Sequence, residues 1–362
     1  MSIIPERVSH WLEEKAEDID FSPHLASEIL PRIGGAGIFR RGVPTEFGGD
    51  GGDVADAVVA IAALSEHSLA AGFVAWGHRS FIEFVLRTPN AALRERLIED
   101  LLTGRRAGAS GLSNAMKFLS GIERLQIIAE ADGELIKING KLPWVTNLRP
   151  DGFDVAAAIQ GSDGRASFVA TLASELPGLG RSNDLDLMGM QASNTAAVDL
   201  VQVRIGPQDI LFPDIQEWLP KVRPAFLALQ CAMSVGLARR SLSETVARAQ
   251  TGRHVLLGDI ERLTSELRRL ESAMLTDLRD GRFITDPAAL FRIRIRLAEV
   301  VAEAIQLELC ASGGSAYLTK SGKDFQRRAR EAAFIPIITP SIVQLKTALE
   351  EQRQRKLSVV PA

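Results

Sequence analysis

Cysteine is scarce in this sequence, its net charge is small and none of its apolar runs is long. Cys231 and Cys310 are the only cysteines among 362 residues. They are too few for a disulfide framework and lack the clustered spacing of a zinc site, so we expect no metal centre. A formal net charge of −3 gives no basic field that would concentrate nucleic acid, which we do not expect as a partner.

The sequence also lacks a segment with the form of a membrane span or an export signal. The most apolar windows, 54–64 and 225–237, are shorter than the roughly 20 residues that cross a bilayer, so we expect core helices and no membrane contact. The beginning of the chain carries glutamates at positions 6, 13, 14 and 17 instead of a basic segment followed by an apolar one. We therefore expect a cytoplasmic protein.

The spacing of apolar residues divides the chain into three parts. Up to about residue 105 they recur at three and four, as in Val54, Val58 and Ile61, which is typical of helices with one buried face. From 106 to 214 the apolar runs are short and often alternating, with Gly and Asp turns between them, which predicts an antiparallel sandwich or barrel. From 215 onward the helical period returns in four long stretches, which predicts a bundle.

These patterns together predict an α+β multidomain fold. Its parts are an N-terminal α-helical domain (1–105), a central antiparallel β domain (106–214) and a C-terminal four-helix bundle domain (215–362). Residues 292–297, Arg-Ile-Arg-Ile-Arg-Leu, alternate as a strand would, but they lie inside a long helical stretch, and we expect helix there.

Three segments carry a more specific signal. Residues 42–49 read Gly-Val-Pro-Thr-Glu-Phe-Gly-Gly, residues 93–104 read Leu-Arg-Glu-Arg-Leu-Ile-Glu-Asp-Leu-Leu-Thr-Gly, and residues 141–147 read Lys-Leu-Pro-Trp-Val-Thr-Asn. Together with the order of the three parts, they resemble the acyl-CoA dehydrogenase superfamily over nearly the whole chain. The strongest local match is that of residues 141–147 to the family's Lys-x-Trp-Ile-Thr-Asn. The resemblance implies a flavoprotein.

The resemblance also implies a flavin site, with FAD as the cofactor and FMN as the alternative. A flavin needs flat apolar packing and a few fixed donors, and Trp144 and Thr146 at one strand end can provide both. Leu112 and Ser113 occupy the place of the family's Leu-Thr-Glu segment, which bonds the pyrimidine side of the ring. The other residues that the resemblance implies for the cofactor are Arg253 at the pyrophosphate, Gly313 and Gly314 in a turn that approaches a neighbouring subunit's FAD, and Thr339.

Two family carboxylates have no counterpart here. The base that removes the proton α to a thioester is normally a Glu, and its position falls on Ile337. The alternative position, directly before Arg223, is Val222, so that the implied substrate pocket holds Val222, Arg223 and Ile337 but no base. Residues 115–121 also depart from the family stretch that holds the pantetheine arm, so the sequence does not predict a CoA site.

One histidine is a candidate for catalysis. His78 lies on a helix that borders the substrate cavity in this superfamily, and a histidine there could donate a proton to a substrate oxygen. The alternative is a histidine that only satisfies a hydrogen bond between packed helices. Arg327, Arg328 and Arg330 likewise leave two interpretations open, structural ion pairs inside the bundle or a phosphate contact.

Three functions are compatible with these residues. The first is a monooxygenase that uses reduced flavin, supplied by a separate flavin reductase, and oxygen on an organic substrate. The second is an acyl-CoA dehydrogenase that passes electrons to an electron-transfer flavoprotein. The third is a scaffold that has lost catalysis. The resemblance further implies a homo-oligomer, dimer or tetramer, because family flavin sites use residues from two chains.

Overall fold

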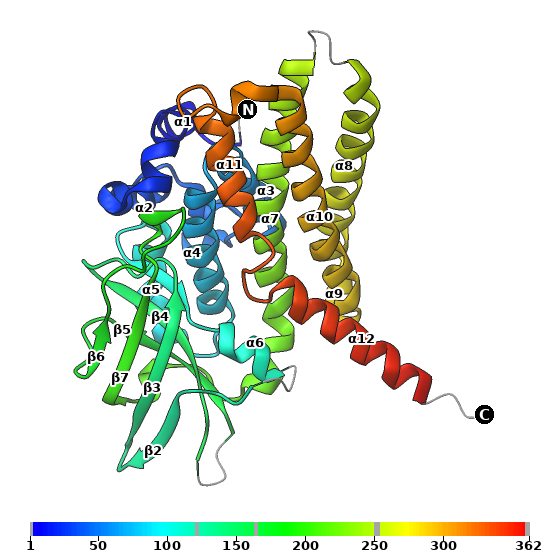
Figure 1. Cartoon of the computed structure of the whole chain (residues 1–362). Helices are drawn as coiled ribbons and strands as arrows, with labels where there is room; N and C mark the ends of the chain where they lie inside the picture. Colours follow the sequence, from blue (N-terminus) through cyan, green and yellow to red (C-terminus); the bar gives the residue numbers. More distant parts are fainter. Residues whose placement is uncertain (1–2, 120–122, 163–165, 250–253, 359–362) are drawn as a thin grey trace.

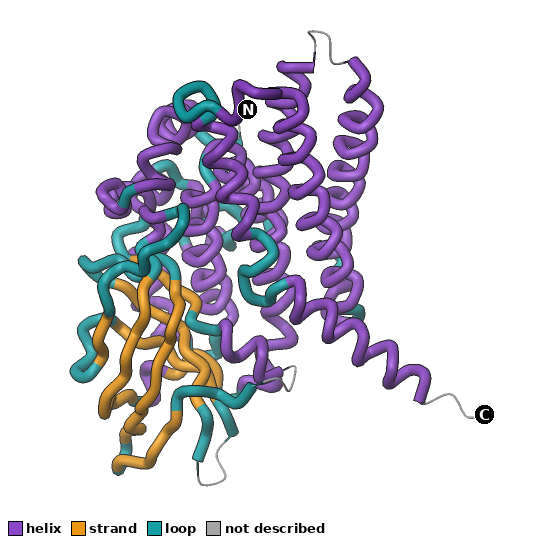
Figure 2. Tube along the Cα trace, in the orientation of Figure 1, coloured by secondary structure: helices purple, strands orange, loops and turns teal. Residues whose placement is uncertain are grey.

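The computed structural model describes residues 3–119, 123–162, 166–249 and 254–358 (Figure 1). The chain is helical, then largely strand, then helical, as the apolar spacing predicts. Figure 2 shows the helices as one body, with the strands gathered at one end of it. The secondary structure changes type between Thr103 and Ala107 and again between Phe212 and Ile215.

The first helical part surrounds one central helix, α4, in which nearly every residue is buried. α3 begins at a capping box in which Asp53 and Asp56 bond each other's backbone N–H groups, and α4 begins where the Ser68 side chain accepts from the Ala71 N–H. The helices and 3-10 turns of this part are α1 (Glu6–Phe21), η1 (Pro23–Leu25), α2 (Ala26–Gly35), η2 (Ile38–Arg40), η3 (Thr45–Phe47), α3 (Val54–His67), α4 (Leu69–Arg87) and α5 (Ala91–Thr103).

The central part holds two four-stranded sheets, in the orders β1-β4-β5-β8 and β2-β3-β7-β6. The prediction of a wholly antiparallel domain is wrong at one pair, because β1 runs parallel to β4. The chain leaves β1 through α6, β2 and β3 before it returns as β4, and a connection of this length permits parallel pairing. The elements are β1 (Ala107–Ser110), α6 (Ser113–Leu119), β2 (Ile128–Asp132), β3 (Leu135–Val145), β4 (Phe153–Ile159), β5 (Phe168–Ala173), β6 (Leu179–Arg181), η4 (Gln191–Ser193), β7 (Ala196–Ile205), η5 (Pro207–Asp209) and β8 (Ile210–Phe212).

The last part contains the long helices of the bundle. α7, α8 and α10 pack against one another, and α7 also packs on α3 and α4 of the first part. Residues 292–297 are helical, as predicted, within α10. The elements are α7 (Ile215–Ala249), η6 (His254–Leu256), α8 (Leu257–Arg279), α9 (Arg282–Thr285), α10 (Pro287–Ser312), η7 (Gly313–Tyr317), α11 (Lys323–Phe334) and α12 (Ile342–Ser358).

The fourth predicted bundle helix behaves differently from the other three. α12 packs mainly on α10 by its first turns and then projects away from the body (Figure 1). Its apolar residues are concentrated before residue 350, and Glu, Gln and Arg follow, so its outer half has no apolar face to bury. The shorter α11 instead lies against α10, α7, α4 and α1.

A single connected set of buried apolar side chains runs through all three parts. Within the described ranges, the helices are each too short or too polar to span a membrane.

Candidate active site

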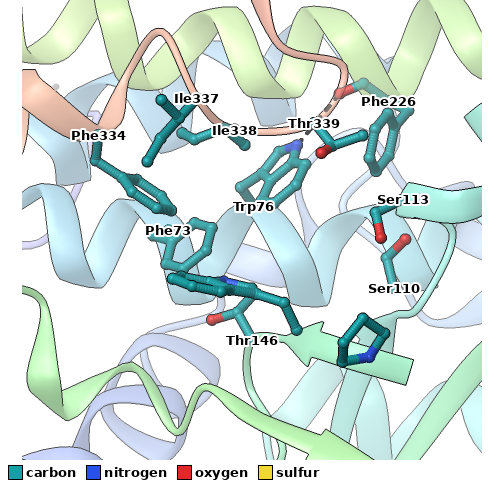
Figure 3. A pocket seen from close by; sticks show the side chains of 12 residues that line it. Phe73, Trp76, Ser110, Ser113, Thr146, Phe226, Phe334, Ile337, Ile338 and Thr339 are labelled. Carbon is teal, nitrogen blue, oxygen red and sulfur yellow. Dashed lines mark hydrogen bonds between the residues drawn. The ribbon is translucent and has the colours of Figure 1, made fainter. Parts of the chain in front are cut away.

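A cavity of about 300 Å³ lies where the three parts of the chain meet. Its walls come from α4, from the turn between β1 and α6, from the end of β3, from α7 and from the connection between α11 and α12 (Figure 3). Its lining consists of Phe73, Trp76, Ser110, Ser113, Pro143, Trp144, Thr146, Phe226, Phe334, Ile337, Ile338 and Thr339.

One wall is aromatic and is fixed by its own contacts. The Trp76 Nε1–H donates to the Phe226 carbonyl oxygen at 3.2 Å, so α4 and α7 are joined across the cavity floor. The Phe73 ring stacks on Trp76 with centroids 5.6 Å apart and meets the Phe334 ring edge to face at 4.9 Å. Such offset and edge contacts hold the ring orientations, so this wall is a preformed apolar surface.

The end of β3 forms the facing wall. Trp144 is 44% exposed, whereas Thr146 is buried. The Thr146 hydroxyl donates to the Ser193 carbonyl oxygen and accepts from the Thr195 hydroxyl, both at 3.2 Å. A Cβ on Gly77 would lie 2.8 Å from the Thr146 methyl group, so only a glycine allows α4 to come this close to the strand.

Two serines form the polar end of the cavity. The Ser110 Oγ is buried and has no hydrogen-bond partner among the described residues, and the Ser113 side chain is half-buried close to it (Figure 3). Leu112 is fully buried between them, behind the lining. An orphaned hydroxyl at a cavity wall is a group that a bound molecule can satisfy.

The connection between α11 and α12 closes the cavity. Ile337 lines it but is 60% exposed at its mouth, whereas Ile338 is buried. Arg294 Nη2 donates to the Ile335 carbonyl oxygen at 2.5 Å, and Gln230 Nε2 donates to the Thr339 carbonyl oxygen at 3.0 Å. Buried donors therefore hold this segment at both ends.

The two other residues of the implied substrate pocket lie elsewhere. Val222 is fully buried in α7 and lines a separate depression with Phe212 and Trp218. Arg223 is half-buried over the Phe291 ring, 5.4 Å from its centroid. Of the three residues in the implied substrate pocket, only Ile337 lines the cavity.

His78 does not line the cavity. Its Nε2 lies 2.8 Å from the Leu101 carbonyl oxygen, and its Nδ1 accepts from the Gly108 N–H at 2.9 Å. Burial lowers the pKa of His78 to about 4, so the ring is neutral at pH 7. Because both nitrogens bond backbone groups, the geometry matches the structural alternative, a histidine that joins α4, α5 and β1, and we assign it no catalytic role.

Two further predicted cofactor residues are not at the cavity. Gly313 and Gly314 lie in η7 beyond the end of α10 and are absent from the lining. Arg253 lies outside the described residues.

The arginine cluster has the structural role that we considered. Arg327 bonds Glu331, Arg328 bonds Glu308 and Arg330 bonds Asp20. All three carboxylate partners, Glu331, Glu308 and Asp20, are deeply buried. Ion pairs inside the bundle are thus confirmed for Arg327 and Arg328, whereas Arg330 pairs with Asp20 of α1, outside the bundle.

The lining residues show what the cavity can hold. Two aromatic walls face each other across a space with hydroxyls at one end, and this suits a flat ring with polar edge atoms. The orphaned Ser110 hydroxyl, with Ser113 beside it, can bond such an edge, so the residues present fit a flavin ring.

The cavity has little capacity for acid–base chemistry of its own. Among its described lining residues there is no Asp, Glu, His, Lys, Arg, Cys or Tyr, and therefore no group that can take up a proton near pH 7. In the described ranges, no three His, Cys, Asp or Glu side chains converge as a metal site would require. What the lining can do is bind, orient and exclude water.

Sequence reasoning missed most of the aromatic wall. Phe73, Trp76 and Phe226 follow the ordinary helical apolar spacing, which does not distinguish a core residue from a cavity residue. Ser110 carried a weak signal, because it stands in the same short segment as Leu112 and Ser113.

Comparisons with known proteins agree on one group. Residues 5–105 match the family described as acyl-CoA dehydrogenase, N-terminal domain. Mitochondrial isovaleryl-CoA dehydrogenase of Pongo abelii is 28% identical over 221 residues, which cover 57% of this chain and 51% of that protein. The probable acyl-CoA dehydrogenase YngJ of Bacillus subtilis is 24% identical over 349 residues, 89% of this chain and 88% of that protein. The match thus spans about half the length of the first relative and most of the second.

Solved structures share the fold at low sequence identity. Glutaryl-coenzyme A dehydrogenase in its glutaryl-CoA complex superposes with a TM-score of 0.82 at 18% identity, over 94% of this chain and 92% of that chain. KijD3, in complex with FMN and an amino-keto sugar nucleotide, gives 0.81 at 17% identity, over 98% and 92%. The nitrososynthase of Micromonospora carbonacea var. africana gives 0.77 at 19% identity, over 96% and 94%.

Proposed function

Because this chain belongs to the acyl-CoA dehydrogenase superfamily, we propose that it is a flavin-dependent oxidoreductase that does not dehydrogenate acyl-CoA thioesters. Its activity in this proposal is that of a monooxygenase, which uses reduced flavin and oxygen on an uncharged part of an organic substrate. A separate flavin reductase supplies the reduced flavin.

The observation that carries this proposal is the absence of a base among the described lining residues. Ile337 stands at the mouth, where the resemblance places the family Glu, and Val222 is buried away from the cavity. The nearest acid in sequence, Glu331, is buried and accepts hydrogen bonds from Arg327 and from the Leu69 N–H. Removal of a thioester α-proton needs a free carboxylate beside the reacting carbon, and Glu331 is already engaged.

The flavin ring in this proposal lies between Trp144 and the aromatic wall. Ser110, Ser113 and Thr146 bond its polar edge, with Leu112 packed behind them and Thr339 at the far side. The bound flavin supplies the exchange of two electrons. The fold neighbour KijD3 is in complex with FMN, and another fold neighbour is described as an FAD-dependent dehydrogenase, which together support either FMN or FAD at this place.

Two features favour oxygenation. The aromatic wall is apolar, and a site that keeps water away protects a reactive reduced cofactor from side reactions. A nitrososynthase and KijD3 share the fold across nearly the whole chain, so the architecture is compatible with chemistry other than acyl-CoA dehydrogenation.

The test is anaerobic mixing of the flavin-loaded protein with a panel of acyl-CoA thioesters in deuterated water. We expect no bleaching of the oxidised flavin and no exchange of the thioester α-proton. Oxygen-dependent turnover of prereduced flavin is expected in the same preparation. An Ile337→Glu variant adds a base, worth typically 10²–10⁴ in rate, and Ile337→Gln is its uncharged control. Rapid exchange in the unmodified protein would overturn the proposal.

The second candidate is acyl-CoA dehydrogenation with an electron-transfer flavoprotein as acceptor. The names of the two curated relatives favour it. It requires a base other than Ile337 or Val222, and bleaching by any thioester of the panel would establish it. A purified protein that is colourless and takes up neither FAD nor FMN would instead support the third alternative, a scaffold without catalysis.

We also propose a homo-oligomer, dimer or tetramer. Tyr317 and Leu318, beside the Gly313–Gly314 turn, are 90% and 61% exposed, and Val343 on α12 is 74% exposed. Large apolar side chains gathered at one turn are typical of a contact surface. Scattering at micromolar concentration should give a mass of at least two chains, and a strictly monomeric protein would contradict this.

A further inference from the structure

Arg294 is a fully buried cation without a carboxylate partner. It projects from α10 and is 0% exposed. Its Nε donates to Gln230 Oε1 at 3.0 Å and its Nη2 donates to the Ile335 carbonyl oxygen at 2.5 Å. Its Nη1 is buried and has no partner in the described part of the chain. Both groups that it bonds are neutral.

Two other arginines that are only 1% exposed show the usual arrangement. Arg79 bonds Glu83 at 2.5 Å and Arg328 bonds Glu308 at 2.5 Å, and all four side chains are almost fully buried. An arginine keeps its proton in proteins, so Arg294 cannot become neutral by losing it. An isolated buried ion is strongly unfavourable, and such a charge acts on whatever occupies the space nearby.

A chain of hydrogen bonds links this charge to the cavity wall. Gln230, which accepts from Arg294 Nε, donates through its Nε2 to the carbonyl oxygen of Thr339, a lining residue. The guanidinium therefore lies two hydrogen bonds from the cavity wall. No charged side chain belongs to the described lining, so nothing in the wall offsets the positive potential, and burial weakens screening by water.

We propose that Arg294 stabilises a negatively charged occupant of the cavity, the anionic two-electron-reduced flavin. This inference rests on the proposed function. Oxidised flavin gains two electrons and one proton, from dithionite or from a flavin reductase, and becomes an anion. The positive potential disfavours binding of the second proton that would make it neutral. Arg294 thus lowers the proton affinity of the reduced flavin from behind the cavity wall and does not touch the reacting atoms.

The competing interpretation is a purely mechanical one. Arg294 and Gln230 hold the two ends of the segment 335–339, and a neutral donor of similar shape could do the same. The two interpretations differ in what happens when the charge alone is removed.

The experiment is a sulfite titration of the oxidised, flavin-loaded protein. Sulfite adds to flavin N5 and leaves a negative charge on the ring, so its affinity reports the potential in the cavity. We expect Arg294→Gln to bind sulfite about tenfold more weakly than the unmodified protein, because one buried charge is lost. Arg294→Lys, titrated at mildly acidic pH so that the ammonium stays protonated, should remain within a few fold. Arg292→Gln removes an exposed charge from the same helix and should change nothing.

Equal sulfite affinity in Arg294→Gln and the unmodified protein, with flavin bound in both, would overturn the proposal and leave the mechanical interpretation. A measurement on the unmodified protein decides the matter if Arg294→Gln does not fold. After reduction by dithionite, its flavin spectrum should stay that of the anion down to mildly acidic pH, and conversion to the neutral form near neutrality would overturn the proposal. A protein that binds no flavin would remove the proposed function and this inference together.

Discussion

Buried charge is arranged differently in two regions of the molecule. One is the contact between α11 and α10, and the other is the cavity. Along α11, Arg327 and Arg328 are buried against Glu331 and Glu308. Around the cavity the described lining carries no charge, and Arg294, two hydrogen bonds behind its wall, bonds no carboxylate in the described part of the chain. In the first region, both arginines are paired with carboxylates of the folded chain.

A buried charge can stabilise the fold or act on a ligand, and the two regions differ in which of these their charges do. A buried pair holds its own helices in register, and removal of one partner leaves the other uncompensated. A lone buried charge beside an uncharged cavity leaves its positive potential free to act on a ligand, besides the hydrogen bonds that it donates. The two regions should therefore respond differently to mutation, the first in stability and the second in binding.

The largest effect is expected where a buried pair is broken. Glu308→Gln leaves Arg328 without its close carboxylate and should lower the free energy of unfolding by about 3–5 kcal/mol, measured by urea denaturation. Glu350→Gln breaks an exposed pair with Arg353 and should cost less than about 1 kcal/mol. Equal losses in the two variants would contradict the distinction.

A somewhat smaller effect concerns pH and His78. Unfolded protein binds a proton at this side chain below about pH 6.5, but the folded protein binds it only near pH 4, where its lowered pKa lies. The contribution of His78 to stability is therefore unchanged above about pH 6.5 and is lost as pH falls toward 4, by about 3 kcal/mol. His78→Gln should unfold with a shallower pH dependence over this range, and an unchanged slope would show that the ring is not held neutral.

Variants at the end of β3 should weaken flavin binding. Trp144→Ala removes a half-exposed ring and should weaken flavin binding about tenfold, measured by quenching of flavin fluorescence. Thr146→Val removes a hydroxyl and should weaken it about fivefold, the equivalent of one hydrogen bond of about 1 kcal/mol. Val201→Ala removes a more exposed apolar side chain from β7 and is the control. Unchanged affinity in both β3 variants would exclude this strand end from the flavin site.

The smallest effect, and the sharpest contrast, is expected at Ser110. Its hydroxyl has no partner, so Ser110→Ala should leave the unfolding free energy of the empty protein within about 0.5 kcal/mol. Flavin binding should nevertheless weaken about fivefold, because a bond to the ring edge is lost. Ser241→Ala removes another orphaned hydroxyl, on α7, and should affect neither quantity. A Ser110→Ala protein that binds flavin normally would assign the hydroxyl no part in the site.

The sequence indicated the fold better than it indicated the cavity. Apolar spacing was sufficient for the three-part order and for the helix at residues 292–297, because helices and strands have different periods. It did not reveal the parallel pairing of β1 with β4, which depends on how the chain returns after β3. It also did not reveal that α12 projects, because a helical period says nothing about which neighbour is present.

At the cavity, the resemblance brought Ser113, Trp144, Ile337 and Thr339 around one space, where the structure places them. Arg294 could not be distinguished from its neighbours by sequence. It is the middle arginine of three that alternate with isoleucine, and only the packing of α10 against α7 decides which one is buried.

All three parts of the chain line the cavity, so a molecule bound there stabilises their association. A ring seated there contacts α4, β3, α7 and the segment after α11 at once, and it loses all these contacts when any part separates. Binding of this kind is thermodynamically linked to folding, and a ligand at one hundred times its dissociation constant adds about 2.7 kcal/mol. Cofactor supply would then set how long each molecule survives proteolysis, since empty chains open more often than loaded ones.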